Sequence, residues 1–306
     1  MIDPLIAIVL SYLRTSELLP LCRYEVDYKI ITQKFIKEFR LIDYSDCMRE
    51  GDIKYLRGIQ TINLTCCVIR DHVLEYLKGV HTIILDKCME ITDEGMKYLK
   101  GVHTINLYCC YQITDRGLEY LKGVHTINLN SCIAVTDRGL QYLKGVHTIH
   151  LYNCYQITDD GLEYLRGVQT IYLSGCSNIT DRGLAYLKGV QTICLFNCQK
   201  ITDRGLEYLI GVRNIYLDNC YQITDEGLKY LKGVHKINLP SGITDKGLEY
   251  LKGVKILRMN NCHLVTDVGV EYLVQNGLRT VGFSNCKRLT RRWVDSPWYS
   301  SEYEVD

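Results

Sequence analysis

A period of 22 residues dominates the middle of this chain. Valine recurs at this spacing, and each valine opens a nearly identical segment: Val102, Val124, Val146, Val168, Val190, Val212 and Val234. A fixed period of roughly 20 to 50 residues is typical of solenoids, in which each unit buries its apolar face only against neighbouring units. The period therefore predicts an elongated array, and it favours function on an extended surface over function in a pocket.

The first half of each unit predicts a short strand. In the unit that starts at Val102, Ile105 and Leu107 alternate with polar residues and lead to Cys110. Because alternate side chains of a strand point to opposite faces, Ile105 and Leu107 are expected to face the core together. The spacing matches the leucine-rich-repeat signature L-x-x-L-x-L-x-x-N/C.

The second half of each unit predicts a short helix. Thr114 and Asp115 offer N-cap oxygens to a helix, and Leu118 and Leu121 face the same core because they lie three residues apart. Gly123 supplies the left-handed residue that ends the helix before the next strand. Each unit is therefore expected to contain one strand, one turn and one short helix.

The chain has fifteen cysteines, and most of them follow the same period. Ten of them occupy one column of the repeat: Cys67, Cys88, Cys110, Cys132, Cys154, Cys176, Cys198, Cys220, Cys262 and Cys286. Zinc sites need close pairs whose thiolates converge on one ion, whereas a stacked column points its sulfurs in parallel, which also disfavours disulfides. We therefore expect small, buried, free cysteines and a reducing compartment, the cytoplasm or the nucleus.

The cysteine column together with the motif I-T-D-x-G-L, found at residues 113–118, 157–162, 201–206 and 223–228, resembles the cysteine-containing subclass of leucine-rich repeats. This subclass is typical of F-box proteins, the substrate receptors of SCF-type ubiquitin ligases. The resemblance implies an α/β leucine-rich-repeat solenoid, a horseshoe with a parallel β-sheet on the concave face and short helices on the convex face. It covers residues 39–290, about twelve repeats. Residues 291–306 lose the period and are expected to cap the array.

The first 38 residues are not a repeat and resemble the front of an F-box. The closest match is the apolar segment 8–13 followed by residues 17–19, preceded by a small helical start at Asp3 and Pro4. The resemblance implies that their apolar side chains bind the adaptor subunit of the ligase: Leu5, Ile8, Val9, Leu10, Tyr12, Leu13, Leu18 and Leu19. Pro4 is displaced, and the end of the F-box pattern has only loose counterparts in Val26 and Phe35. The segment is therefore either an F-box, possibly shortened, or a helical cap on the first repeat.

Two columns of the predicted concave face differ between otherwise matching units, the columns of Asn106 and Tyr108. Since packing does not dictate identity there, they are free to carry recognition of a target protein. Within them Tyr108, Tyr152, Tyr172, Phe196 and Tyr216 form what we call the aromatic strip, and aromatic side chains are the usual anchors of protein interfaces. The predicted target-binding residues are Tyr108, His150, Tyr152, Tyr172, Phe196, Tyr216, Asp218 and Arg258. The alternative is that these rings only stack on one another in solvent.

Other regular columns have structural explanations. The tyrosines equivalent to Tyr120 share one helix register and are expected to pack between helices. His81, His103, His125 and His147 form a ladder whose spacing follows from the period and not from metal geometry, so surface positions are expected.

Composition argues against several classes of function. The 36 basic and 35 acidic residues leave a net charge of +1, and the aromatic strip lacks interleaved Lys and Arg, which disfavours nucleic acid. The longest apolar stretch near the start, residues 5–10, is too short to span a membrane. The sequence has no phosphate-binding glycine loop, zinc-protease motif or nucleophile elbow, so we expect no enzyme activity and no cofactor.

Two functional classes remain. The first is the substrate receptor of an SCF-type ubiquitin ligase, monomeric apart from its complex with the adaptor and the target. The second is a free-standing leucine-rich-repeat scaffold or inhibitor. Near-identical units also occur in expanding repeat families of large DNA viruses, in which case the expected location is the host cell cytoplasm.

Overall fold

A computed structural model of the chain describes residues 38–40, 50–294 and 296–297. The chain divides into two compact units, Met1–Val146 and His147–Asp306, and each unit is described by itself. In both, the backbone repeats one motif of a three- to five-residue strand followed by a short helix.

Unit 1 has a parallel sheet in which sequential strands are neighbours. Its strands are β1 (Glu38–Arg40), β2 (Thr61–Asn63), β3 (Thr82–Ile84), β4 (Thr104–Asn106) and β5 (Thr126–Asn128). Its helices are η1 (Glu50–Leu56), η2 (Asp71–Leu77), α4 (Asp93–Met96), η3 (Lys97–Leu99), α5 (Asp115–Leu118), η4 (Glu119–Leu121), α6 (Asp137–Leu140) and η5 (Gln141–Leu143).

Unit 2 repeats this order and ends with longer elements. Its strands are β6 (Thr148–His150), β7 (Thr170–Tyr172), β8 (Thr192–Cys194), β9 (Asn214–Tyr216), β10 (Lys236–Leu239), β11 (Ile256–Asn260) and β12 (Thr280–Ser284), again parallel and in sequential order. Its helices are α7 (Asp159–Leu162), η6 (Glu163–Leu165), α8 (Asp181–Leu184), η7 (Ala185–Leu187), α9 (Asp203–Leu206), η8 (Glu207–Leu209), α10 (Asp225–Leu228), η9 (Lys229–Leu231), α11 (Asp245–Glu249), α12 (Asp267–Gln275) and η10 (Arg291–Trp293).

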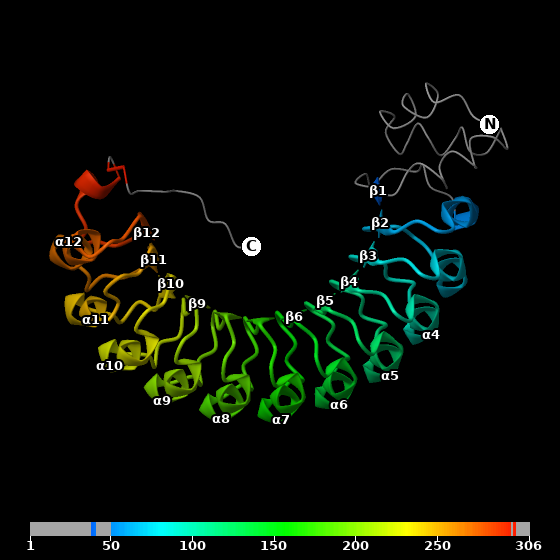
Figure 1. Cartoon of the computed structure of the whole chain (residues 1–306), viewed down its shortest axis with the longest axis horizontal. Coiled ribbons are helices and arrows are strands. Elements are labelled where there is room, and N and C mark those ends of the chain that lie inside the picture. Colours follow the sequence, from blue (N-terminus) through cyan, green and yellow to red (C-terminus); the bar gives the residue numbers. More distant parts are fainter. Residues whose placement is uncertain (1–37, 41–49, 295, 298–306) are drawn as a thin grey trace, which may run out of the picture. The chain divides into compact units, whose positions relative to one another are not determined.

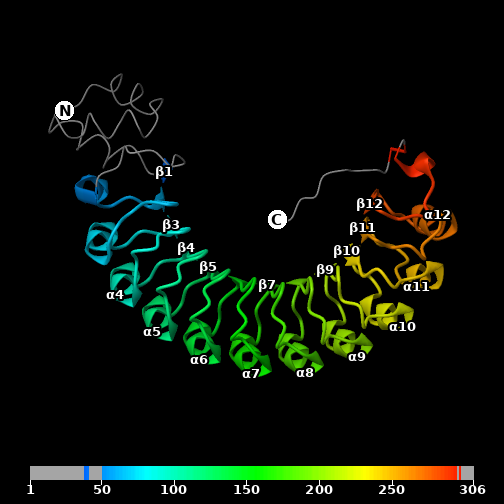
Figure 2. The ribbon, with the colours of Figure 1, turned by 180° about the vertical axis from the view of Figure 1, so that it is seen from behind.

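In each unit the strands line one side and the helices line the other (Figure 1). Parallel strands lie about 4.8 Å apart, whereas packed helices need about 8 to 10 Å, so each unit curves with its strands on the inner, concave side. The view from behind shows the same two layers in each unit (Figure 2). This is the predicted leucine-rich-repeat solenoid fold, with a parallel sheet on the concave side and short helices on the convex side.

The core between these layers contains the predicted apolar columns. Ile105, Leu107, Leu118 and Leu121 are fully buried or nearly so, and their counterparts in the other repeats are buried as well. Gly123 has a φ of 84° and ends its helix in the left-handed region, as predicted. The interior is therefore a stack of identical apolar layers, and no repeat buries its own layers without its neighbours.

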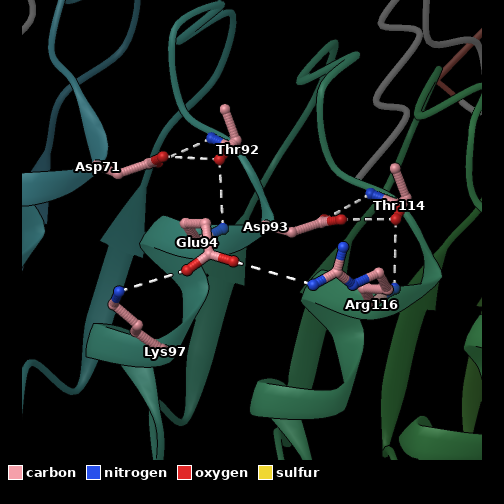
Figure 3. A network of polar contacts seen from close by, with 7 residues as sticks. All are labelled: Asp71, Thr92, Asp93, Glu94, Lys97, Thr114 and Arg116. Carbon is pink, nitrogen blue, oxygen red and sulfur yellow. Dashed lines mark hydrogen bonds and ion pairs between the residues drawn. The ribbon is translucent and has the colours of Figure 1, made fainter.

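The Thr-Asp pair that recurs in most repeats has two separate roles, and one of them differs from the prediction. Thr114 caps its helix, because its hydroxyl accepts a hydrogen bond from the backbone N–H of Arg116 at 3.3 Å. The aspartates were expected to cap helices too, which is wrong. The carboxylate of Asp93 instead accepts two hydrogen bonds from Thr114 of the next repeat, from its N–H at 2.8 Å and from its hydroxyl at 2.6 Å (Figure 3).

The same geometry recurs within each unit, so the aspartates form a ladder that joins neighbouring repeats of the unit. Asp71 binds Thr92 in this way, and Asp181 binds Thr202. The ladder also explains the glycine that stands two residues after the aspartate in every repeat from Asp93 to Asp267. A Cβ atom added to Gly117 would lie 2.5 Å from Oδ1 of Asp93. Only glycine leaves room for the carboxylate of the preceding repeat.

A second ladder runs through the buried cysteines. The thiol of Cys110 donates to the backbone carbonyl of Leu85 in the preceding repeat at 3.1 Å, and the thiol of Cys198 donates to Leu173 at 3.2 Å. All thirteen cysteines that the structure describes are free. Burial raises the pKa of Cys110 to about 12, so the thiol keeps its proton and remains a donor. The cysteine column thus stabilises the stack by hydrogen bonding as well as by filling space.

Two surface columns also form ladders. The ammonium group of Lys122 lies 5.0 Å from the ring centroid of Tyr142 in the next repeat, which matches the predicted packing role of the tyrosines. In unit 1 the exposed rings of His81, His103 and His125 stack with 4.5 Å between neighbouring centroids. The histidines therefore lie on the surface, as expected.

The repeat that contains Pro240 is two residues shorter, yet the aspartate ladder crosses it. Asp225 still accepts from the N–H of Thr244 at 2.9 Å and from its hydroxyl at 2.5 Å, over 19 residues instead of 21. The deletion is therefore absorbed in the loop between β10 and α11, and the sheet continues through the short repeat.

Candidate functional site

The concave side of unit 2 carries two exposed aromatic rings of the aromatic strip. Tyr152 follows β6 and is 40% exposed, and Phe196 follows β8 and is 39% exposed. The strands present them because the buried Leu151 and Leu195 alternate with them and face the core. Both rings are available to a partner on this side of the unit.

His150 and Tyr172 lie next to each other on β6 and β7 and form a stacked pair. Their ring centroids are 4.2 Å apart with an interplanar angle of 12°. Burial lowers the pKa of His150, so the imidazole is held in its neutral form. Tyr172 is therefore half-buried against His150 and is less exposed than Tyr152.

Three predicted target-binding residues lie deeper than expected. Tyr216, Asp218 and Arg258 are 7%, 6% and 9% exposed. The ammonium group of Lys236 lies 5.1 Å from the ring centroid of Tyr216, and the side-chain amide of Asn260 donates to Asp218 at 2.8 Å. Packing against neighbouring side chains therefore restricts which residues can stand at these three positions. The prediction that packing does not dictate identity in these columns is wrong for them.

Tyr108 is the one predicted strip residue in unit 1, and it is half-buried. Its backbone N–H donates to the side-chain oxygen of Asn106 at 3.0 Å, and the ammonium group of Lys87 lies 5.9 Å from its ring centroid. Asn63 and Asn128 bind the backbone two residues ahead in the same way. The asparagines of this column thus fix the strand ends, a local role that sequence comparison did not reveal.

The exception to this asparagine pattern is Asn238. Its side-chain oxygen is buried and has no hydrogen-bond partner among the residues that the structure describes. The residue two positions ahead is Pro240, which has no N–H to donate. The three-residue pattern N-x-P at the end of a predicted strand was the available signal for this unsatisfied acceptor.

Ser174 and Cys194 belong to the variable columns but were not among the predicted site residues. Both are buried, and Oγ of Ser174 lies 3.1 Å from Sγ of Cys194. Cys194 is the strand partner of Tyr172 and stands two residues before Phe196, so both small side chains lie close to aromatic residues of the strip. Small residues beside large ones in the same column were the signal that could have identified them.

The exposed rings extend beyond the strands onto the adjoining loops. Tyr111 in unit 1 and Tyr155 and Tyr221 in unit 2 are all exposed, each directly after a column cysteine. Within unit 2 the strand side and its loop edge therefore both present aromatic surface, the chemistry that protein interfaces favour.

The predicted adaptor-binding residues, from Leu5 to Leu19, lie outside the residues that the structure describes. Within the described ranges, no group of three or more His, Cys, Asp or Glu side chains is placed to hold a metal ion. No described helix is long and apolar enough to cross a membrane.

Comparisons with known proteins show the fold. No protein-family model matches the chain, and no curated protein matches its sequence. Among solved structures, the complex of Rad7 and Elc1 from yeast is similar with a TM-score of 0.67 and 16% identity, covering 96% of this chain and 89% of the other. An internalin from Listeria monocytogenes is similar with a TM-score of 0.63 and 15% identity, covering 94% of each chain.

A third similar structure is the complex of TLR13 with a single-stranded RNA, with a TM-score of 0.61 and 14% identity. It covers 88% of this chain and 39% of the other. At these identities the shared property is the leucine-rich-repeat solenoid fold, and the function has to come from the surface of this chain.

Proposed function

We propose that this protein is a protein-interaction module and that its target binds the concave side of unit 2. The observation that carries the proposal is the pair of exposed rings, Tyr152 and Phe196, on the strand side of unit 2. Each ring gives a partner a large apolar contact at small entropic cost. The solenoid fold supports the same function, because it supplies a wide surface and no deep pocket.

We further propose that the module is the substrate-recognition subunit of an SCF-type ubiquitin ligase. Residues 1–38 would bind the adaptor subunit, residues 39–290 would hold the target, and residues 291–306 would cap the array. The F-box-like pattern at residues 8–13 and 17–19 supports this, as does the similarity to Rad7, which was solved in a complex with Elc1. The protein would then act by holding a target near the ligase and raising its effective concentration.

The free cysteines support a reducing compartment, so we place the protein in the cytoplasm or nucleus, or in the host cytoplasm if it is viral. The alternative function is a free-standing scaffold or inhibitor without a ligase. A pull-down of the ligase adaptor separates the two, using the full-length protein and a variant that lacks residues 1–38. The ligase proposal predicts binding by the full-length protein only. If the full-length protein does not bind the adaptor, the ligase proposal is wrong and the scaffold function stands.

The concave surface is tested by affinity capture with the double variant Tyr152→Ala and Phe196→Ala. We expect it to lose partners that the wild-type protein retains, with little change in the thermal unfolding temperature, because both rings are more than a third exposed. Tyr250→Ala is the matched control, since Tyr250 is 39% exposed but follows helix α11 on the convex side. Equal capture by the double variant and the wild-type protein would contradict this assignment of the surface.

A further inference from the structure

A row of basic side chains lies at the start of the last four strands of unit 2. Arg213, His235, Lys255 and Arg279 each precede a strand, β9 to β12 in order, and we call them the basic row. Their backbones are hydrogen bonded in sequence: His235 N–H donates to Arg213 at 2.8 Å, Lys255 to His235 at 2.9 Å and Arg279 to Lys255 at 2.9 Å. The four residues are thus direct neighbours, one per strand, and span about 14 Å at the usual strand spacing.

The strands that follow the basic row contain no acidic side chain. Besides the row itself, the segments 213–216, 235–239, 255–260 and 279–284 contain Lys236 and the buried Arg258, and no Asp or Glu. The nearest acid in the next column, Asp218, is 6% exposed and accepts a hydrogen bond from Asn260. Within the described part of the chain no ion pair involves the basic row, and the Lys255 ammonium donates to the carbonyl of Gly277 at 3.1 Å.

The earlier repeats of the same unit show that the fold does not require this charge. The corresponding segments of β6 to β8, residues 147–150, 169–172 and 191–194, contain no Lys or Arg. Gln169 and Gln191 occupy the column of the basic row and make the same backbone bonds, since Gln191 N–H donates to Gln169 and Arg213 N–H donates to Gln191, both at 2.9 Å. Lys255 and Arg279 carry like charges one strand apart, which repel each other, so the fold gains nothing from charge at these positions.

We propose that the basic row and the adjacent Lys236 bind an acidic segment of a partner protein. Arg213 and Arg279 are exposed and Lys255 is half-exposed, so a carboxylate-rich chain can approach all three. Arginine presents a planar fork that matches carboxylates, and an extended acidic segment along the row would neutralise the repulsion between the cations. The column of the basic row contains no Phe, Tyr or Trp side chain on which nucleic acid bases would stack, which favours an acidic peptide as the occupant.

The surface lies at one end of the strands, beside the concave side that carries Tyr152 and Phe196, and it does not depend on the ligase function. An acidic peptide is used as the probe, so a negative result here leaves adaptor binding and concave-side capture untouched. Conversely, loss of adaptor binding would not affect the basic row.

The test is fluorescence anisotropy with a labelled octaglutamate peptide and the full-length protein. The triple variant Arg213→Gln, Lys255→Gln and Arg279→Gln introduces glutamine, which already stands in the same column of earlier repeats as Gln169 and Gln191. The charge-matched control is Arg138→Gln, Arg204→Gln and Lys246→Gln, three exposed cations on helices. Urea unfolding midpoints of all three proteins verify that the folds are intact.

We expect the triple variant to bind the peptide at least about tenfold more weakly than the wild-type protein, and the control to differ less than about twofold. The difference should shrink as salt rises from about 50 mM to about 300 mM, because screening weakens exposed charge interactions. Absence of binding by the wild-type protein at low salt, or equal weakening by both variants, overturns the proposal. Tighter binding of a single-stranded octathymidylate, lost in the same triple variant, would assign the row to nucleic acid and also overturn it.

Discussion

The contact between each aspartate and the glycine of the next repeat predicts a strong energetic coupling between two residues 24 positions apart. Asp93 and Gly117 are the pair to test, since both lie in unit 1 and Asp93 binds Thr114 there (Figure 3). A Cβ atom at residue 117 would lie 2.5 Å from Oδ1 of Asp93 but 3.3 Å from the nearest other side-chain atom, Cγ of Met96. The obstacle to alanine is therefore almost entirely the carboxylate.

The expected magnitudes follow from two opposing effects. Replacing a helical glycine with alanine stabilises by about 0.5 to 1 kcal/mol, while overpacking costs about 1 to 3 kcal/mol. We expect Gly117→Ala to destabilise the wild-type protein by about 1 to 2 kcal/mol. Asp93→Ala should cost about 2 kcal/mol because the two hydrogen bonds from Thr114 are lost at a half-buried site. In that background Gly117→Ala should be neutral or stabilise by up to about 1 kcal/mol.

The assay is equilibrium urea unfolding of the wild-type protein, both single variants and the double variant, followed by circular dichroism. The free energies should give a coupling of about 2 kcal/mol between the two sites. Gly123→Ala is the control, because Gly123 has a φ of 84° and no atom within 4 Å of an added Cβ, so its cost should be equal with and without Asp93. If Gly117→Ala costs the same in both backgrounds to within about 0.5 kcal/mol, the explanation of the Asp-x-Gly spacing is refuted.

Three further predictions test the ladders and the strand ends. Burial raises the pKa of Cys110 from 9.0 to about 12. The stability that the neutral thiol contributes is therefore full below about pH 9 and is lost as the pH rises toward 12. Above about pH 9 the urea midpoint should fall less in Cys110→Ser than in the wild-type protein. Desolvation and the neighbouring His125 and His81 lower the pKa of His103 below 6.5, so the contribution of His103 to stability is full above about pH 6.5 and is lost as the pH falls. The variant His103→Gln should therefore show a smaller drop in urea midpoint between about pH 7.5 and about pH 5.5 than the wild-type protein. An unchanged drop would contradict this. Asn106→Ala should lower the free energy of unfolding in urea by about 1 kcal/mol more than Asn238→Ala does. The reason is that Asn106 accepts a hydrogen bond from the N–H of Tyr108, whereas the side-chain oxygen of Asn238 has no partner beside Pro240. Equal losses would show that this hydrogen bond at the strand end does not stabilise the fold.

The variable columns show how far sequence comparison reached into the candidate site. It placed Tyr152 and Phe196 on the strand side, where they are exposed, because alternation along a strand is a local property. It also grouped Tyr216, Asp218 and Arg258 with them, and these residues are buried by Asn260, Lys236 and the neighbouring strands. Burial depends on the size of side chains one and two repeats away, which the identity of a residue does not reveal.

The sequence by itself determined the repeated strand and helix, the buried Ile, Leu and Cys columns, the threonine caps and the glycine stops, because each depends on dihedral preferences and alternation within one repeat. Only the tertiary structure decided what joins the repeats. The aspartate carboxylate binds the threonine of the next unit, and the cysteine thiol donates to the leucine carbonyl of the preceding unit. The basic row likewise exists only because parallel strands bring Arg213, Lys255 and Arg279 together from three separate repeats. Such contacts depend on the register between strands, and that register is set by how the units stack.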